Sequence, residues 1–171
     1  MYNPQEKNLC LKCRHFNDAQ ADLCEICGAE LFKFPAQPPK SDQAYREIEE
    51  KTGQFKYGSL SATDYWNYLV KQQIFYEKHL QEIESMDLPA EHRSEFAQEM
   101  QTGTNGIRHL IEGIKLLQEY CEQKSQANLS HQGLSMAKTG NELLNQAIAI
   151  NWVNFHAIKK SFEEFLTEYN L

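Results

Sequence analysis

Two C-x-x-C pairs near the N-terminus constrain the fold of this chain more than any other feature. Cys10 and Cys13 form the first pair and Cys24 and Cys27 the second, with ten residues between the pairs. Each C-x-x-C turn directs two sulfurs at one point, and ten residues are enough to bring the second turn opposite the first. The spacing predicts one structural Zn²⁺ with four thiolate ligands. Such a site keeps no open position for water or substrate, which indicates a folding role and not catalysis.

The alternatives for these cysteines are disulfide pairing and four unbound thiols. The chain begins Met-Tyr-Asn-Pro-Gln-Glu-Lys, without the basic start and apolar run of a secretory signal. We therefore expect a reducing, cytoplasmic compartment, in which metal binding is favoured over disulfides. His15 is expected to lie outside the ligand set, as a surface turn residue. The fifth cysteine, Cys121, lies in a helical pattern and is expected to be a buried structural thiol.

The residues around the cysteines resemble a known family. From position 10 to 31 they read C-x2-C-x3-N-x3-A-x-L-C-x2-C-G-A-x-L. This resembles the short bacterial zinc-ribbon modules found at the ends of longer proteins. The Cys and Asn spacing is also similar to the Ran-binding-protein zinc fingers, some of which bind ubiquitin and others single-stranded RNA. Asn8 stands where that finger has Trp, and Arg14-His15 where its ubiquitin-binding versions have Thr-Phe. The resemblance therefore implies the zinc ligands and the ribbon fold alone.

The sequence predicts a zinc ribbon over 1–34, a linker over 35–41 and an α-helical bundle over 42–171. Prolines at positions 35, 38 and 39 block helix and sheet pairing in the linker. A ribbon this small buries little apolar area, so metal binding is expected to supply most of its folding energy. The apolar side chains expected around the metal are Leu9, Phe16, Leu23, Ile26, Leu31 and Phe32.

Helical periodicity and cap signals predict a mostly α protein, an antiparallel bundle of three long helices and one short helix. The short helix is capped by Ser41 or Asp42 and ends near Lys51, with Gly53 in the left-handed position beyond it. Phe55 and Tyr57 follow in a loop and are expected to fold back on the core. The long helices are expected from Ser61 to about Met86, from Pro89 to about Lys124, and from Leu129 to about Tyr169.

Glycines recur in the last two predicted helices. The apolar phase is unchanged across Thr102-Gly-Thr-Asn-Gly106, which favours one continuous helix despite the two glycines. Gly106 and Gly113 are spaced by seven residues, as are Gly133, Gly140 and Ala147. A turn near residues 126 and 127 would place Gly113 opposite Gly140, Gly106 opposite Ala147, and Tyr120 opposite Gly133. We therefore expect close backbone approach along this seam.

Charge and motifs bound the function. The formal charge is −7, and all of it lies in residues 41–171, which hold 12 basic and 19 acidic side chains. Without a basic run, nucleic acid is an unlikely partner. No apolar stretch approaches the roughly 20 residues of a membrane span. Neither a di-metal carboxylate pattern, a phosphate-binding glycine loop nor a nucleophile elbow occurs, so no catalytic residues are assigned.

The function expected from these features is a non-enzymatic adaptor or regulatory protein that binds a protein partner. A second hypothesis is a nucleic-acid-associated regulator that uses Lys12, Arg14, His15 and Lys33 of the ribbon. A third is an enzyme or small-molecule sensor, with a pocket between helices lined by Trp66, Tyr76 or Trp152. The identity of the partner and the oligomeric state do not follow from the residues.

Overall fold

The computed structural model describes residues 8–10, 12–13, 15–18, 21–31, 40, 42–88, 93–124 and 126–168. The chain divides into two compact units, residues 1–37 and 38–171. Most of the described residues are helical, in α1 (Gln43–Lys56), α2 (Ala62–Glu84), α3 (Arg93–Glu122) and α4 (Ala127–Glu168). The two short strands, β1 (Asn8–Leu9) and β2 (Phe16–Asn17), belong to the first unit. The predicted linker lies largely outside the described residues.

Helix α1 is longer than the sequence suggests. It continues through Gly53 to Lys56, and the left-handed residue is Gly58, with φ of 79°. The extra turn forms because Phe55 is buried, one helical turn after the buried Thr52. Tyr57 does not fold back with it, since 82% of its surface is exposed. The prediction was therefore right that Phe55 joins the core, but wrong in placing Phe55 in a loop, and wrong for Gly53 and Tyr57.

The start of α1 is held by a tertiary contact in place of a local cap. Asp42 occupies the N-cap position, but its side chain makes no capping hydrogen bond. Its Oδ1 instead accepts from Asn141 Nδ2 at 3.1 Å and from Asn145 Nδ2 at 3.0 Å. Both amides lie on α4, so Asp42 attaches the beginning of α1 to the middle of α4. Ser41, the other predicted cap, lies outside the described residues.

Helix α2 begins with the predicted Ser61 cap. Ser61 Oγ accepts from the Asp64 N–H at 3.1 Å and donates to Asp64 Oδ2 at 2.6 Å. Tyr65, Leu69 and Tyr76 are buried along one face of the helix. Gln118 of α3 donates to Gln73 of α2, and Arg108 of α3 donates to Glu84 of α2. The earlier residue of α3 thus pairs with the later residue of α2, so the two helices run antiparallel.

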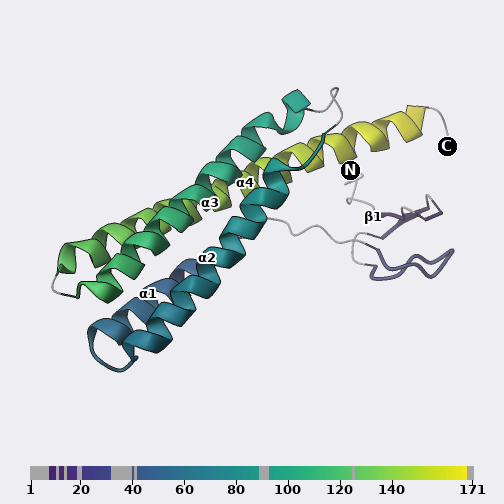
Figure 1. Ribbon diagram of the computed structural model, residues 1–171. Coiled ribbons are helices and arrows are strands. Elements are labelled where there is room, and N and C mark those ends of the chain that lie inside the picture. The colour runs from purple at the N-terminus through teal and green to yellow at the C-terminus, as the bar shows by residue number, and fades with distance from the viewer. Residues whose placement is uncertain are drawn as a thin grey trace, which may run out of the picture. The chain divides into compact units, whose positions relative to one another are not determined.

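Helix α3 is continuous across Thr102–Gly106, as the apolar phase predicts. It lies beside α4, which runs in the opposite direction (Figure 1). Across this pair Gly106 faces Gly140 and Gly113 faces Gly133. Glycines therefore meet as expected, but the predicted partners are wrong by seven residues. The helices α3 and α4 are joined by residues 123–126, so the hairpin turns earlier than the assumed position at 126–127.

Twelve buried residues form the core of the helical unit. The members are Ile48, Phe55, Tyr65, Leu69, Tyr76, Ile107, Leu110, Ile111, Ile114, Leu117, Tyr120 and Ala137. At one end of this core the Phe55 ring stacks on Tyr65, with centroids 4.7 Å apart, and meets the Tyr120 ring edge-on at 5.6 Å. Thr52 Oγ1 and Tyr65 Oη lie 2.8 Å apart in the same region. Four aromatic or polar side chains thus join α1, α2 and α3.

The described helices include none that is both long and apolar enough to cross a membrane. Cys121 is half-buried, and its Sγ lies 3.5 Å from the carbonyl oxygen of Ala62. Burial raises the pKa of this thiol, with a further contribution from Glu122. The thiol is thus less buried than predicted, and it packs against the first residue of α2.

Candidate metal centre

The four sulfurs predicted to bind metal come together in the first unit. All four Sγ atoms lie within 4.8 Å of one another. Cys10 and Cys27 are separated by 3.5 Å, and Cys13 and Cys24 by 3.4 Å. Tetrahedral Zn²⁺ with Zn–S bonds of about 2.3 Å places its sulfurs about 3.8 Å apart. The two shortest separations lie slightly below that value and no pair is more than 4.8 Å apart, so the group can hold one metal ion.

Backbone hydrogen bonds shape both cysteine turns. β1 and β2 pair antiparallel, and the Cys10 N–H donates to the His15 carbonyl at 2.9 Å, which closes the first turn. In the second turn the Cys24 N–H donates to the Ala29 carbonyl at 2.8 Å. The Gly28 N–H returns to the Cys24 carbonyl, also at 2.8 Å. Gly28 has φ of 67°, a conformation that favours glycine at this point.

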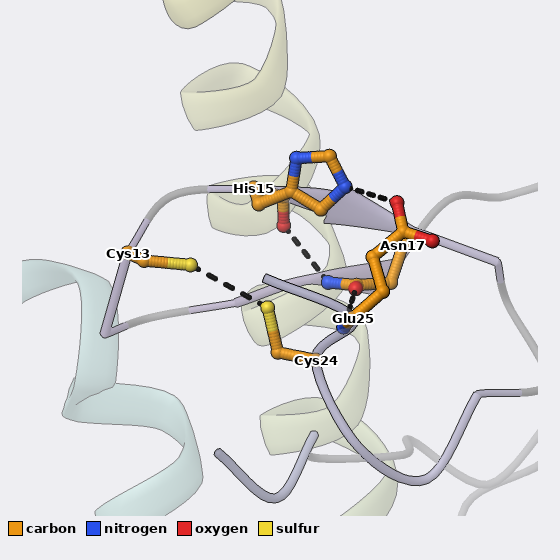
Figure 2. A network of polar contacts seen from close by, with 5 residues as sticks. All are labelled: Cys13, His15, Asn17, Cys24 and Glu25. Atoms are coloured by element: carbon orange, nitrogen blue, oxygen red, sulfur yellow. Dashed lines mark hydrogen bonds and ion pairs between the residues drawn. The ribbon is translucent and has the colours of Figure 1, made fainter. Parts of the chain in front are cut away.

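Asn17 connects the two turns. It is 3% exposed, and its Nδ2 donates to the His15 carbonyl at 3.0 Å. Its Oδ1 accepts from the Glu25 N–H at 2.9 Å, so one side chain bonds the backbone of both C-x-x-C turns (Figure 2). The sequence singled out Asn17 only through a family resemblance. Its position between the two cysteine pairs, as a side chain with both a donor and an acceptor, was the available signal.

His15 lies outside the group of sulfurs. Its Nε2 contacts Glu25 Oε1, as Figure 2 shows, and this contact adds a side-chain connection between the two turns. The side chains that converge are those of the four cysteines, without His15. His15 was expected to be a surface turn residue, and it is half-buried against Glu25.

Backbone N–H groups lower the pKa values of two of the four thiols, Cys10 and Cys24. The Cys13 N–H lowers the pKa of Cys10. Burial opposes ionisation of Cys24, but the N–H groups of Cys27 and Ile26 and the neighbouring sulfurs lower its pKa to about 6. The His15 N–H favours the Cys13 thiolate, yet burial and the three other sulfurs raise the Cys13 pKa to about 12. Adjacent sulfurs thus share a limited negative charge, which a cation would neutralise.

The sulfur separations do not match disulfides. A disulfide bond is about 2.05 Å long, much shorter than the 3.4 and 3.5 Å between the nearest sulfurs. All five cysteines are free in this structure. Four sulfur donors suit a thiophilic metal with tetrahedral coordination and leave that metal no vacant position.

The apolar interior of this unit is smaller than predicted. Cys10, Cys24 and Leu31 are buried, with Ala21, Cys27 and Ala29 packed against them. Leu23 is 56% exposed and Ile26 is 67% exposed, so their predicted place in the core is wrong. Cys24 points inward toward the other sulfurs, and its apolar neighbours are left on the outside. The side chains of Leu9, Phe16 and Phe32 lie outside the described residues.

The residues named in the other two hypotheses are only partly described. Lys12 is exposed and His15 contacts Glu25, whereas Arg14 and Lys33 lie outside the described residues. Tyr76 is buried, and Trp66 and Trp152 are half-buried. A hollow of about 490 Å³ on α1 is lined by none of these aromatic residues. Its lining residues are Lys40, Asp42, Gln43, Arg46, Glu47 and Glu50.

Within the described ranges, the cysteine group is the one set of three or more His, Cys, Asp or Glu side chains with converging ligand atoms. Comparison of the chain with protein-family models, curated protein sequences and solved structures finds no match. The site must therefore be interpreted from its own geometry and chemistry.

Proposed function

We propose that this chain is a non-enzymatic adaptor, in which a zinc ribbon presents one protein-binding surface and an acidic helical bundle presents another. The observation that carries the proposal is the convergence of Cys10, Cys13, Cys24 and Cys27. Zinc with four thiolates is coordinatively complete, so it stabilises the fold around it and offers no site for a reacting group. A small unit held in this way is suited to recognition.

Zinc is the proposed ion because its chemistry matches the donor set. Thiolates are soft ligands, and four of them in tetrahedral arrangement are typical of Zn²⁺ or of iron–sulfur centres. The short turns and the backbone N–H groups directed at the sulfurs are compatible with a single ion. Elemental analysis of purified protein separates the two metals, since zinc and iron are measured independently.

The charge distribution supports a protein partner over a nucleic acid. Residues 41–171 hold 12 basic and 19 acidic side chains, so phosphate would be repelled at long range. The adaptor is proposed to act in a reducing compartment, where four thiolates remain available to metal. In the proposed architecture, the four helices form an antiparallel bundle and the linker separates it from the ribbon.

A capture experiment tests the adaptor function. The wild-type chain, a Cys24→Ser/Cys27→Ser chain and residues 38–171 alone are immobilised and exposed to native lysate, and retained proteins are quantified by mass spectrometry. We expect one set of proteins on the wild-type chain that the cysteine variant fails to retain, and a second set that all three baits retain. If the wild-type chain enriches no protein over an empty support, the adaptor function is wrong.

A further inference from the structure

Leu23 and Ile26 lie on either side of Cys24 in sequence, and both are exposed. We propose that these two side chains anchor a docking surface for a segment of another protein that combines apolar residues with Lys or Arg. This inference rests on the adaptor function proposed above, and it specifies the surface and the chemistry of the partner. We call Leu23, Ile26 and the acidic residues around them the knuckle surface.

Exposure is the first argument. More than half of the Leu23 surface and two thirds of the Ile26 surface are open, while Leu31 on the same segment is 7% exposed. The buried cluster beside Leu31 consists of Ala21, Ala29 and cysteines and does not include Leu23. Two large aliphatic side chains exposed within four residues of each other are more than the isolated apolar residue expected on any surface.

Rigidity is the second argument. The backbone that carries Leu23 and Ile26 is tied by the Cys24–Ala29 and Gly28–Cys24 hydrogen bonds and by Leu31 N–H to the Asp22 carbonyl at 2.9 Å. Asn17 bonds the N–H of Glu25, directly beside Ile26. Anchors held in place before binding lose less conformational freedom on association. The knuckle surface is therefore preorganised for a partner.

Charge identifies the partner. Between His15 and Phe32 the sequence contains four acidic residues and neither Lys nor Arg. All four are exposed, namely Asp18, Asp22, Glu25 and Glu30. Of these, Glu25 contacts His15, and the others add negative charge within a few residues of the two apolar anchors. An apolar surface with neighbouring carboxylates complements an apolar residue flanked by cations. The same carboxylates disfavour a phosphate backbone, so nucleic acid does not fit this surface.

A second copy of this chain is a poor occupant for the same reason. Residues 41–171 have 19 acidic and 12 basic side chains and would be repelled by the knuckle surface at long range. The exposed aliphatic residues Ile74 and Val153 of the helical unit also lie in this acidic part of the chain. The partner is therefore a different protein with a basic, apolar segment.

Selection from a random peptide library displayed on phage tests the inference. The bait is the full chain, loaded with Zn²⁺, and the Leu23→Ser/Ile26→Ser chain is used for counter-selection. We expect the enriched peptides to combine Lys or Arg with aliphatic or aromatic residues. Synthetic copies should bind the double variant at least about tenfold more weakly, as for other buried anchors. Their affinity should fall as salt is raised.

Matched variants make the result specific. Ile74→Ser/Val153→Ser removes two aliphatic side chains that are 61% and 58% exposed on α2 and α4, and it should leave peptide affinity unchanged. Glu30→Gln should weaken binding and reduce its dependence on salt. Metal content and circular dichroism confirm that each variant is folded. If the Leu23→Ser/Ile26→Ser chain is zinc-free or unfolded, Leu23→Thr/Ile26→Thr takes its place, because Thr is β-branched and intermediate in size between Ser and the native residues.

Three results would overturn the inference. The first is that the enriched peptides lack basic residues. The second is that they bind the double variant as tightly as the wild type. The third is that an oligonucleotide binds the wild type and not the double variant. The lysate experiment separates this failure from that of the adaptor function. One outcome is that proteins are lost from the Cys24→Ser/Cys27→Ser chain but retained by the Leu23→Ser/Ile26→Ser chain. That result would support the adaptor function and refute the knuckle surface as its binding site.

Discussion

Gly106 and Gly140 face each other across α3 and α4 so closely that neither has room for a side chain. A Cβ built on Gly140 would lie 2.6 Å from the carbonyl oxygen of Gly106 and 2.8 Å from the backbone nitrogen of Leu110. A Cβ on Gly106 would lie 2.9 Å from the carbonyl oxygen of Gly140. Because the obstacles are backbone atoms, the two helices would have to separate to admit even a methyl group.

Gly140→Ala is therefore expected to destabilise the protein, by about 1–3 kcal/mol, as overpacked cores do. Helix propensity alone predicts the opposite, a gain of about 1 kcal/mol. Gly140→Leu should cost more. The matched control is Gly53→Ala in α1, where an added Cβ meets nothing within 4 Å and propensity should prevail. Urea unfolding followed by circular dichroism measures both, and a stabilised Gly140→Ala protein would refute the close approach.

Tyr65→Phe is expected to destabilise the helical unit by about 1 kcal/mol, the usual net value of a buried hydrogen bond. The hydroxyl of Tyr65 lies 2.8 Å from Thr52 Oγ1, and Thr52 also donates to the Ile48 carbonyl at 2.7 Å. The variant keeps the ring that stacks on Phe55. Tyr57→Phe, at an 82% exposed position, is the control and should leave the unfolding midpoint unchanged.

Stability is expected to fall as pH rises above 10. Burial raises the pKa of Tyr65, Tyr68 and Tyr76 above the usual value of 10, and burial together with Glu49 raises that of Tyr45 to about 12. The unfolded chain then releases phenolic protons that the folded chain keeps, so alkaline pH favours unfolding, and the stabilisation is fully present below pH 10. Urea midpoints measured from neutral pH to pH 12 test this, and a flat profile would contradict it.

Tyr68→Phe should reduce that alkaline loss and leave neutral stability equal or slightly higher. The hydroxyl of Tyr68 is buried and has no hydrogen-bond partner among the described residues. Removing an unsatisfied buried hydroxyl eliminates a desolvation cost without losing a bond. A clear loss of stability at neutral pH would show that the hydroxyl is bonded.

Metal removal should unfold residues 1–37 and leave the helices intact. Purified protein is expected to contain about one Zn²⁺ per chain, bound by four thiolates. A chelator should then abolish the chemical-shift dispersion of the first unit, while the helical circular dichroism is retained because the core in α1–α4 has no metal ligand. Cys13→Ser should reproduce the effect. Metal-free protein with a folded first unit would disprove the structural role.

Asn17→Ala should weaken metal retention without removing a ligand. The variant removes the acceptor of the Glu25 N–H and one of two donors to the His15 carbonyl, which keeps the Cys10 N–H, at a cost of about 1 kcal/mol for each lost bond. The competing concentration of chelator needed to remove half the metal should fall accordingly. Asn151→Ala, which removes an exposed hydrogen bond to Glu99, should not change it.

Features that depend on neighbouring residues could be predicted from the sequence. The four cysteines converge as their spacing requires, and Ser61 caps α2 through Asp64 three residues later. The continuity of α3 across Thr102–Gly106 followed from apolar periodicity. The cap and the helix continuity arise from local backbone geometry, and the cysteines that converge lie at most 17 residues apart in the chain. The identity of the metal and the function of the protein remain predictions.

Features that depend on distant partners were decided by tertiary structure alone. The Asp42 side chain does not cap its own helix, because its Oδ1 accepts hydrogen bonds from the amides of Asn141 and Asn145 on α4, about a hundred residues further along the chain. The glycine register shifted by one heptad because every heptad places the same face inward, and only the connection and the packing select among them. Leu23 and Ile26 are exposed because sulfurs and alanines fill the small interior beside them. The local sequence pattern thus determined which helices and turns form. The competition for buried space in the tertiary structure determined which side chains remain exposed.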